Sequence, residues 1–213
     1  LEHFEKKQGL FFLNECFRVL KSNGIIRVVV PDLEQIVNSY LDNLIKAKSG
    51  DSSACERYEW TVIELIDQLQ RNFSGGEMAK YWQQSLMPAK EFVIDRVGSE
   101  LREYLDTVIS PPVEEKKKFH IFRKLYYKIQ SIFFYSQSKE IKVGRFRLSG
   151  EPHLWMYDSY SLQTILKRVG FVSIAQCKFN ESLILNFNQY LLDIEVNGFV
   201  RKPDSLFMEA LKI

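Results

Sequence analysis

Residues 14–34 read NECFRVLKSNGIIRVVVPDLE, and this stretch predicts the end of a helix, a turn, a buried strand and the start of a second helix. Apolar residues at helical spacing precede Gly24, which is expected to supply the left-handed residue that ends the helix. Ile and Val fill residues 25–30 except at Arg27, the composition of a strand covered on both faces in a parallel α/β sheet. Pro31 is expected to close the strand.

The residues that follow this strand predict both a helix and the position of a site. Asp32 can cap the helix, with Gln35 three residues later in a variant of the capping box. In open α/β sheets, ligands bind outside the carboxyl ends of the strands. The first candidates for function are therefore Val30, Pro31, Asp32 and Glu34.

Composition narrows the class of protein. With 213 residues and 46% apolar content, the chain can bury a substantial core. A net charge of +2 is close to balance and does not indicate a nucleic-acid-binding protein. The sequence contains no apolar run of membrane-spanning length and no signal sequence at its start, so we expect a cytoplasmic location.

Cysteine and histidine usage argues against metal chemistry. Three widely separated cysteines suit a reducing compartment. Neither they nor the three histidines show the spacing of a metal-binding motif, so the sequence predicts no metal site. The six residues are Cys16, Cys55, Cys177, His3, His120 and His153.

Four short motifs resemble those of one enzyme family. Leu-Glu-His-Phe at residues 1–4, Arg-Val-Leu-Lys-Ser-Asn-Gly at 18–24 and Val-Pro-Asp-Leu at 30–33 keep the family's order and spacing. Residues 153–171 add a His, aromatics, an acidic cap and a Leu-rich helix that ends in Gly-Phe. Together they resemble the C-terminal half of class I S-adenosylmethionine-dependent methyltransferases. Ser-Asn stands where the family usually has Pro-Gly.

The resemblance implies a fold and a cofactor. It implies a partial Rossmann-like sheet of the last three strands, whose final strand runs antiparallel between the other two, with a large helical insertion. The first strand, the glycine-rich turn and the acidic residue for the cofactor ribose would all precede Leu1. S-adenosylmethionine would then serve the complete protein, and this chain alone should be inactive. The expected divisions are residues 1–46 and 144–213 for the core and 47–143 for the insertion.

Methyl transfer to a hydroxyl requires alignment of the acceptor and a group that accepts its proton. His153 is the best candidate base, with Glu151 and Asp158 close enough in sequence to orient it. The alternative is that His153 forms hydrogen bonds within a packed loop. The family resemblance implies that the acceptor is a small molecule or a sugar-linked group.

Further residues follow from their position in the motifs. The resemblance implies that Glu2, His3 and Pro31 lie near the cofactor, although we favour an exposed, frayed terminus for residues 1–3 in this chain. Arg147 can bind an anionic acceptor. The other expected acceptor-binding residues are Asp32, Trp155 and Tyr157.

The insertion offers two further interpretations. Residues 114–135 combine lysines and aromatics in an amphipathic pattern, which suits either a non-catalytic module that contacts a membrane surface or an arm packed on the protein. Glu64, Asp67 and Arg71 lie at helical spacing and could line a pocket. We favour a solvated helix face with a surface ion pair for these three residues.

Overall fold

The computed structural model describes residues 1–109 and 138–213, which form an α/β structure of helices and a small antiparallel sheet. The elements are, in chain order, α1 (Lys6–Val19), β1 (Ile25–Pro31), α2 (Leu33–Lys48), α3 (Ser52–Gln70), α4 (Gly76–Trp82), α5 (Lys90–Val97), α6 (Ser99–Ile109), α8 (Lys139–Arg147), α9 (Ser159–Val169), β2 (Val172–Gln176), the 3₁₀ helix η1 (Phe187–Tyr190) and β3 (Ser205–Leu211).

The sheet has the strand order β1-β3-β2, with β3 antiparallel to both neighbours. The expectation that the final strand lies antiparallel between the two preceding ones is therefore confirmed. Among the described residues, β1 pairs with β3 alone, and a parallel neighbour of β1 is not present in them. Pairing of Pro31 with Ser205 brings the start of β3 to the carboxyl end of β1.

Two turns differ from the sequence prediction. The left-handed residue before β1 is Asn23, with φ of 63°, and Gly24 instead fits a crowded position beside Leu20. Asn adopts this conformation more readily than most residues because its short side chain is polar. The sequence of residues 88–105 predicts a single helix, but the structure has two helices there, α5 and α6, which are separated at Gly98.

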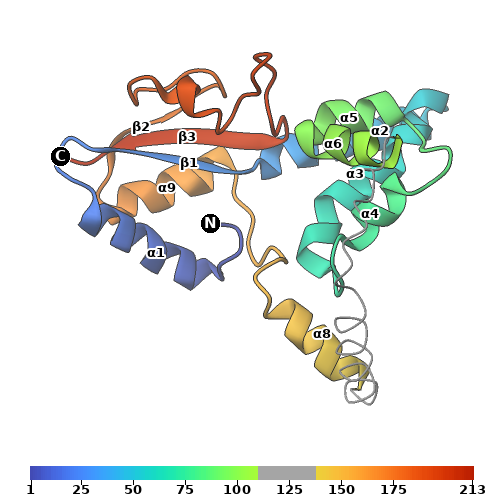
Figure 1. Cartoon of the computed structure of the whole chain (residues 1–213), viewed down its shortest axis with the longest axis horizontal. Helices are drawn as coiled ribbons and strands as arrows, with labels where there is room; N and C mark the ends of the chain where they lie inside the picture. The colour runs from blue at the N-terminus through green and yellow to red at the C-terminus, as the bar shows by residue number, and fades with distance from the viewer. Residues whose placement is uncertain (110–137) are drawn as a thin grey trace, which may run out of the picture.

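The sheet is covered on both faces. Helices α1 and α9 lie on one face, while the segment 177–204, including η1, lies on the other (Figure 1). The core between the sheet and these two helices is apolar and buried. Its most deeply buried side chains are Leu13, Val30, Leu162, Leu166, Phe171 and Leu206. Their burial provides the main driving force that holds the helices on the sheet.

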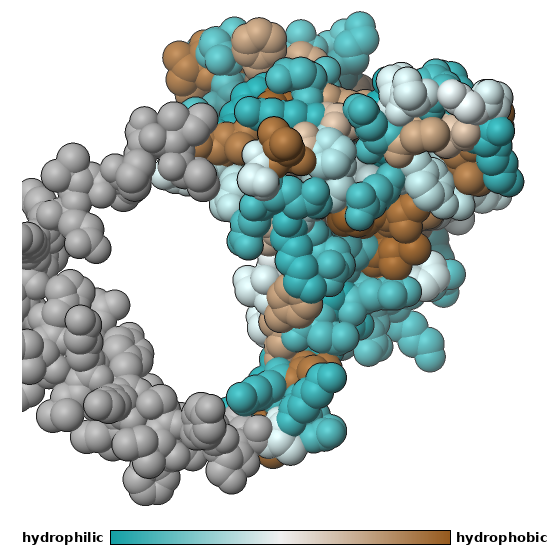
Figure 2. Space-filling model, turned by 90° about the vertical axis from the view of Figure 1, so that its right-hand side faces the viewer, coloured by the Kyte–Doolittle hydropathy of each residue, from teal (hydrophilic) through white to brown (hydrophobic). Residues whose placement is uncertain are grey.

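Helices α2 to α6 gather at one end of the sheet (Figure 1), and α3 to α6 enclose a second apolar cluster. That cluster contains Trp60, Met78, Tyr81, Val93 and Leu101. The outer surface at this end is mainly hydrophilic, with small separate hydrophobic patches (Figure 2). None of the described helices is long and apolar enough to cross a membrane. The amphipathic segment 114–135 lies outside the described residues.

The open edge of β1 predicts self-association. Asp32 N–H donates to the Asp204 carbonyl, so the alternation of an antiparallel ladder directs the amides of Ile25, Arg27 and Val29 away from β3. Such an edge is a template for pairing with another chain. We expect light scattering to show concentration-dependent association, with slow hydrogen exchange of these three amides in the associated form. A monodisperse monomer at every concentration contradicts this prediction.

Candidate functional site

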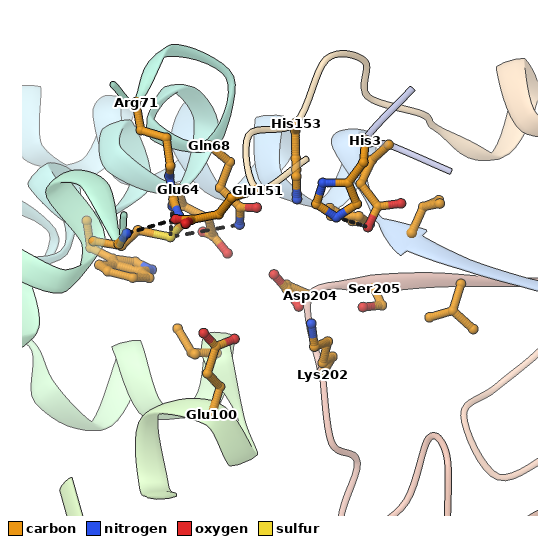
Figure 3. A pocket seen from close by; sticks show the side chains of 18 of the residues that line it. His3, Glu64, Gln68, Arg71, Glu100, Glu151, His153, Lys202, Asp204 and Ser205 are labelled. Atoms are coloured by element: carbon orange, nitrogen blue, oxygen red, sulfur yellow. Dashed lines mark hydrogen bonds and ion pairs between the residues drawn. The ribbon is translucent and has the colours of Figure 1, made fainter. Parts of the chain in front are cut away.

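A cavity of about 290 Å³ lies where the carboxyl end of β1 meets the helical group. Three walls surround it (Figure 3). His3 and His153 form one wall, Arg71 and Glu151 belong to the second, and Asp204 projects from the third. The lining residues therefore include some from the chain start, from α3, from the segment between α8 and α9, and from residues 202–205 where β3 begins.

A backbone bridge brings the segment before α9 to the end of β1. The Asp32 Oδ1 atom accepts hydrogen bonds from the amides of Glu34 at 3.1 Å and Gln35 at 3.3 Å, which confirms its predicted capping role. Leu33 N–H donates to the Tyr157 carbonyl at 2.9 Å. This contact anchors the segment that carries His153 and Glu151.

The histidine wall is held by backbone hydrogen bonds. Leu154 N–H donates to the Glu2 carbonyl at 2.8 Å, and His153 N–H donates to the Gln68 carbonyl at 3.0 Å. The rings of His3 and His153 meet edge to face, with centroids 4.8 Å apart. Burial lowers the pKa of His153 to about 4, although the Glu2 carboxylate opposes this shift. The His153 ring is thus neutral at pH 7, and the segment 1–3 is packed rather than frayed.

The second wall contains an ion network. Arg71 Nη2 donates to the Asp67 carboxylate at 2.6 Å, and Arg71 Nη1 lies 3.6 Å from Glu151. Glu151 also accepts from the Gly75 amide at 3.0 Å. The prediction of a solvated surface pair is wrong, because Asp67 and Glu64 are both buried. Glu64 and Asp67 do lie on one helix, α3, as their spacing predicts, but helices α4 and α5 cover that face of α3.

The Glu64 carboxyl of α3, beside Arg71 in the second wall (Figure 3), lies near enough to Asp204 in the third wall for the two charges to interact. Glu64 is paired with Arg96, whose Nη2 lies 2.8 Å from Oε1, while burial raises the pKa of the Glu64 carboxyl. Burial, reinforced by the nearby Glu64 charge, raises the pKa of Asp204 to about 7. Lys202 projects beside Asp204 (Figure 3). At neutral pH, Asp204 therefore exists in both its protonated and its ionised form.

Several predicted site residues line the cavity, namely Glu2, His3, Pro31, Glu151 and His153. Glu151 contacts Arg71 and Gly75, and no hydrogen bond to His153 is present in the described structure, so the prediction that it orients His153 is not supported. Lys202 and Asp204 also line the cavity, but the sequence did not predict them as site residues. Their proximity to Pro31 does follow from the antiparallel placement of the last strand, which the resemblance implied.

The remaining predicted residues have other roles. Asp158 caps α9 by accepting from the Ser161 amide at 2.7 Å, so it does not orient His153. Arg147 donates to the Leu69 carbonyl at 2.7 Å instead of facing the cavity. Trp155 and Tyr157 line a separate groove between α1 and α9. Asp32 caps α2 and is not among the residues that line the cavity.

No family model, curated protein or solved structure matches this chain.

Proposed function

We propose that the cavity binds the acceptor of an S-adenosylmethionine-dependent methyltransferase, of which this chain forms the C-terminal part. The observation that carries the proposal is a polar cavity at the carboxyl end of β1 into which the Asp204 carboxyl projects. Ligands of open α/β sheets bind at this end of the strands. The four motifs and the antiparallel final strand between its two predecessors agree with the same family.

The cavity suits a small polar acceptor. Its volume of about 290 Å³ is at the lower end of the range for ligand pockets. Lys202, Glu100 and Gln68 lie around it and offer donors and acceptors of hydrogen bonds. A sugar hydroxyl or a similar alcohol matches this mixture better than an apolar group. We therefore propose a monosaccharide-sized or sugar-linked acceptor.

Asp204 is the proposed proton acceptor. A general base works best when its pKa lies near the working pH, and the pKa of Asp204 is about 7. When the acceptor oxygen takes the methyl group, the carbon–sulfur bond of S-adenosylmethionine would break, S-adenosylhomocysteine would leave, and the hydroxyl proton would pass to the Asp204 carboxylate. S-adenosylmethionine supplies the activated methyl group in the complete protein. The resemblance implies that Glu2, His3 and Pro31 lie near this cofactor, and all three line the cavity.

The test uses the complete protein, S-adenosylmethionine with a labelled methyl group, and a panel of monosaccharides and sugar-linked acceptors. We expect a labelled methyl ether, and a rate that rises with pH through about 7 as Asp204 ionises. Asp204→Asn is expected to lower kcat about 100-fold or more and to remove this pH dependence.

Asp51→Asn is the matched control for this test. Asp51 caps α3 by accepting from the Ala54 amide at 3.0 Å, and Asn is an equally good cap. The control should keep the wild-type rate and pH profile. A wild-type profile in Asp204→Asn contradicts the assignment of the base, and the absence of labelled product across the panel contradicts the acceptor class.

A further inference from the structure

Glu2, His3 and His153 bring three metal-binding groups together at the histidine wall. One ligand atom from each residue lies within 4.8 Å of the other two. The sequence predicted no metal site because His153 is 150 positions from His3 along the chain. The fold joins them through the backbone hydrogen bonds from Leu154 and Trp155 to the Glu2 carbonyl.

The orientation of His3 fits a metal ligand. Its Nδ1 faces the Pro152 carbonyl at 3.4 Å, and its Nε2 lies 3.7 Å from Oε1 of Glu2. Histidines that bind metals commonly direct one ring nitrogen to a backbone carbonyl, which fixes the tautomer and leaves the other nitrogen free to coordinate. The Oε1 atom of Glu2 therefore lies beside the ring nitrogen that is left to coordinate.

His153 supplies an independent observation. Its side chain is more than nine-tenths buried, and its Nδ1 has no hydrogen-bond partner among the described residues. A buried polar nitrogen without a partner is costly and requires an explanation, of which a bound ion is one. Here the nitrogen belongs to a ring that already lies against a second histidine and near a carboxylate.

We propose that Glu2, His3 and His153 bind a divalent transition-metal ion, with Zn²⁺ as the best-suited probe. Two imidazoles and one carboxylate, with a remaining position for water or substrate, are a typical ligand set of catalytic zinc sites. Because all three residues line the cavity, the open position would face it. An acceptor oxygen could bind there. This last consequence rests on the proposed function, whereas metal binding does not.

Binding requires a small closure of the three ligands. Donor atoms bound at about 2.0–2.2 Å around one tetrahedral ion are roughly 3.3–3.6 Å apart. The observed separations of up to 4.8 Å are wider. The His3 side chain is 43% exposed, so it can rotate toward the buried His153 at little packing cost.

The test titrates untagged, chelator-treated protein with ZnCl₂ by calorimetry, without acceptor or cofactor. We expect one ion per chain with micromolar or tighter affinity. His3→Ala and Glu2→Gln should each weaken binding at least 10-fold, and His153→Ala should weaken it more. Visible absorption of bound Co²⁺ should report a low-symmetry site with nitrogen ligands and change in the His3→Ala variant.

Matched controls separate this site from adventitious binding. Glu5→Gln alters the exposed acidic N-cap of α1, and His120→Ala removes the remaining histidine of the chain, so both should bind Zn²⁺ like the wild type. Circular dichroism checks the fold of each variant. If His153→Ala fails to fold, the His3→Ala variant still tests the proposal, because the His3 side chain is partly exposed. The proposal is overturned if the wild type does not bind Zn²⁺ with micromolar affinity, or if His3→Ala and Glu2→Gln bind it as tightly as the wild type does. Neither result bears on Asp204 as the base, which is measured separately.

Discussion

Replacing Arg27 with methionine is expected to lower the free energy of unfolding by about 3–5 kcal/mol, because the change leaves two buried carboxylates without their cation. Arg27 Nε lies 2.7 Å from Asp193, and Nη1 lies 2.8 Å from Glu209. All three side chains are at least nine-tenths buried. Methionine fills a similar volume, so the loss reports the charge network and not a large cavity.

Arg27 also holds the segment 177–204 on the sheet. Its guanidinium donates to the carbonyls of Lys178 and Glu181 and lies over the rings of Phe187 and Phe207. Burial alone would raise the pKa of the Glu209 carboxyl. Hydrogen bonds from Ser182, the Leu183 amide and Arg27 nevertheless hold that pKa below its ordinary value. The network therefore keeps the carboxylate ionised inside the protein.

Guanidinium denaturation followed by far-UV circular dichroism measures the Arg27→Met effect. The matched control is Arg18→Met, since Arg18 forms an exposed ion pair with Glu15 at 2.8 Å. Pairs of that kind contribute about 0–1 kcal/mol. A triple variant that adds Asp193→Asn and Glu209→Gln should recover part of the lost stability, because no unpaired charge then remains. Equal losses in Arg27→Met and Arg18→Met would count against a stabilising network.

The second large effect is expected at the break between α5 and α6. Gly98 has φ of 76° and ψ of −132°, a backbone conformation that is strained for any residue with a Cβ. A Cβ at this position would lie 2.3 Å from the Arg201 carbonyl oxygen and 2.5 Å from Pro203. Because the backbone strain and the steric collision must both be relieved, Gly98→Ala should lower the free energy of unfolding by about 3 kcal/mol or more.

The Gly98→Ala substitution should also disturb the cavity, because residues 201–203, against which Gly98 packs, directly precede Asp204. Ser99 N–H donates to the Arg201 carbonyl at 2.9 Å, which joins the start of α6 to this segment. We expect Gly98→Ala to unfold at lower denaturant concentration and to increase amide exchange at Ser99. Gly144→Ala is the control, because Gly144 lies in α8 with open space around its Cα. It should be neutral or slightly stabilising. Similar stability of the two variants contradicts the argument.

Sequence patterns were most successful where the cause of structure is local. The cap at Asp32, the glycine stop at Gly170 and the strand at residues 25–30 were all predictable, since each depends on neighbouring residues. Predictions were wrong where a contact with a distant part of the chain overrides the local pattern. The pattern of residues 88–105 is helical throughout, but packing of Gly98 against Arg201 divides it. Such a contact leaves no periodic signal in the sequence.

The candidate site was only partly predictable for the same reason. His153 and His3 stood out by residue type, and both line the cavity. Asp204 did not, because its raised pKa comes from burial and from the charge of Glu64, which is 140 residues earlier in the chain. Asp158 and Arg147 were plausible by type, yet their side chains are used by a helix cap and a backbone carbonyl.

The sequence by itself determined the helix-strand-helix unit around β1 and, through the family resemblance, the antiparallel position of β3. It also marked the carboxyl end of β1 as the place for a site. Only the tertiary structure decided which polar groups meet there. Burial, ligand distances and pKa shifts depend on surfaces that come together across the chain, as when Glu2, His3 and His153 converge or when Glu64 lies near Asp204. Local propensity carries no record of such long-range contacts.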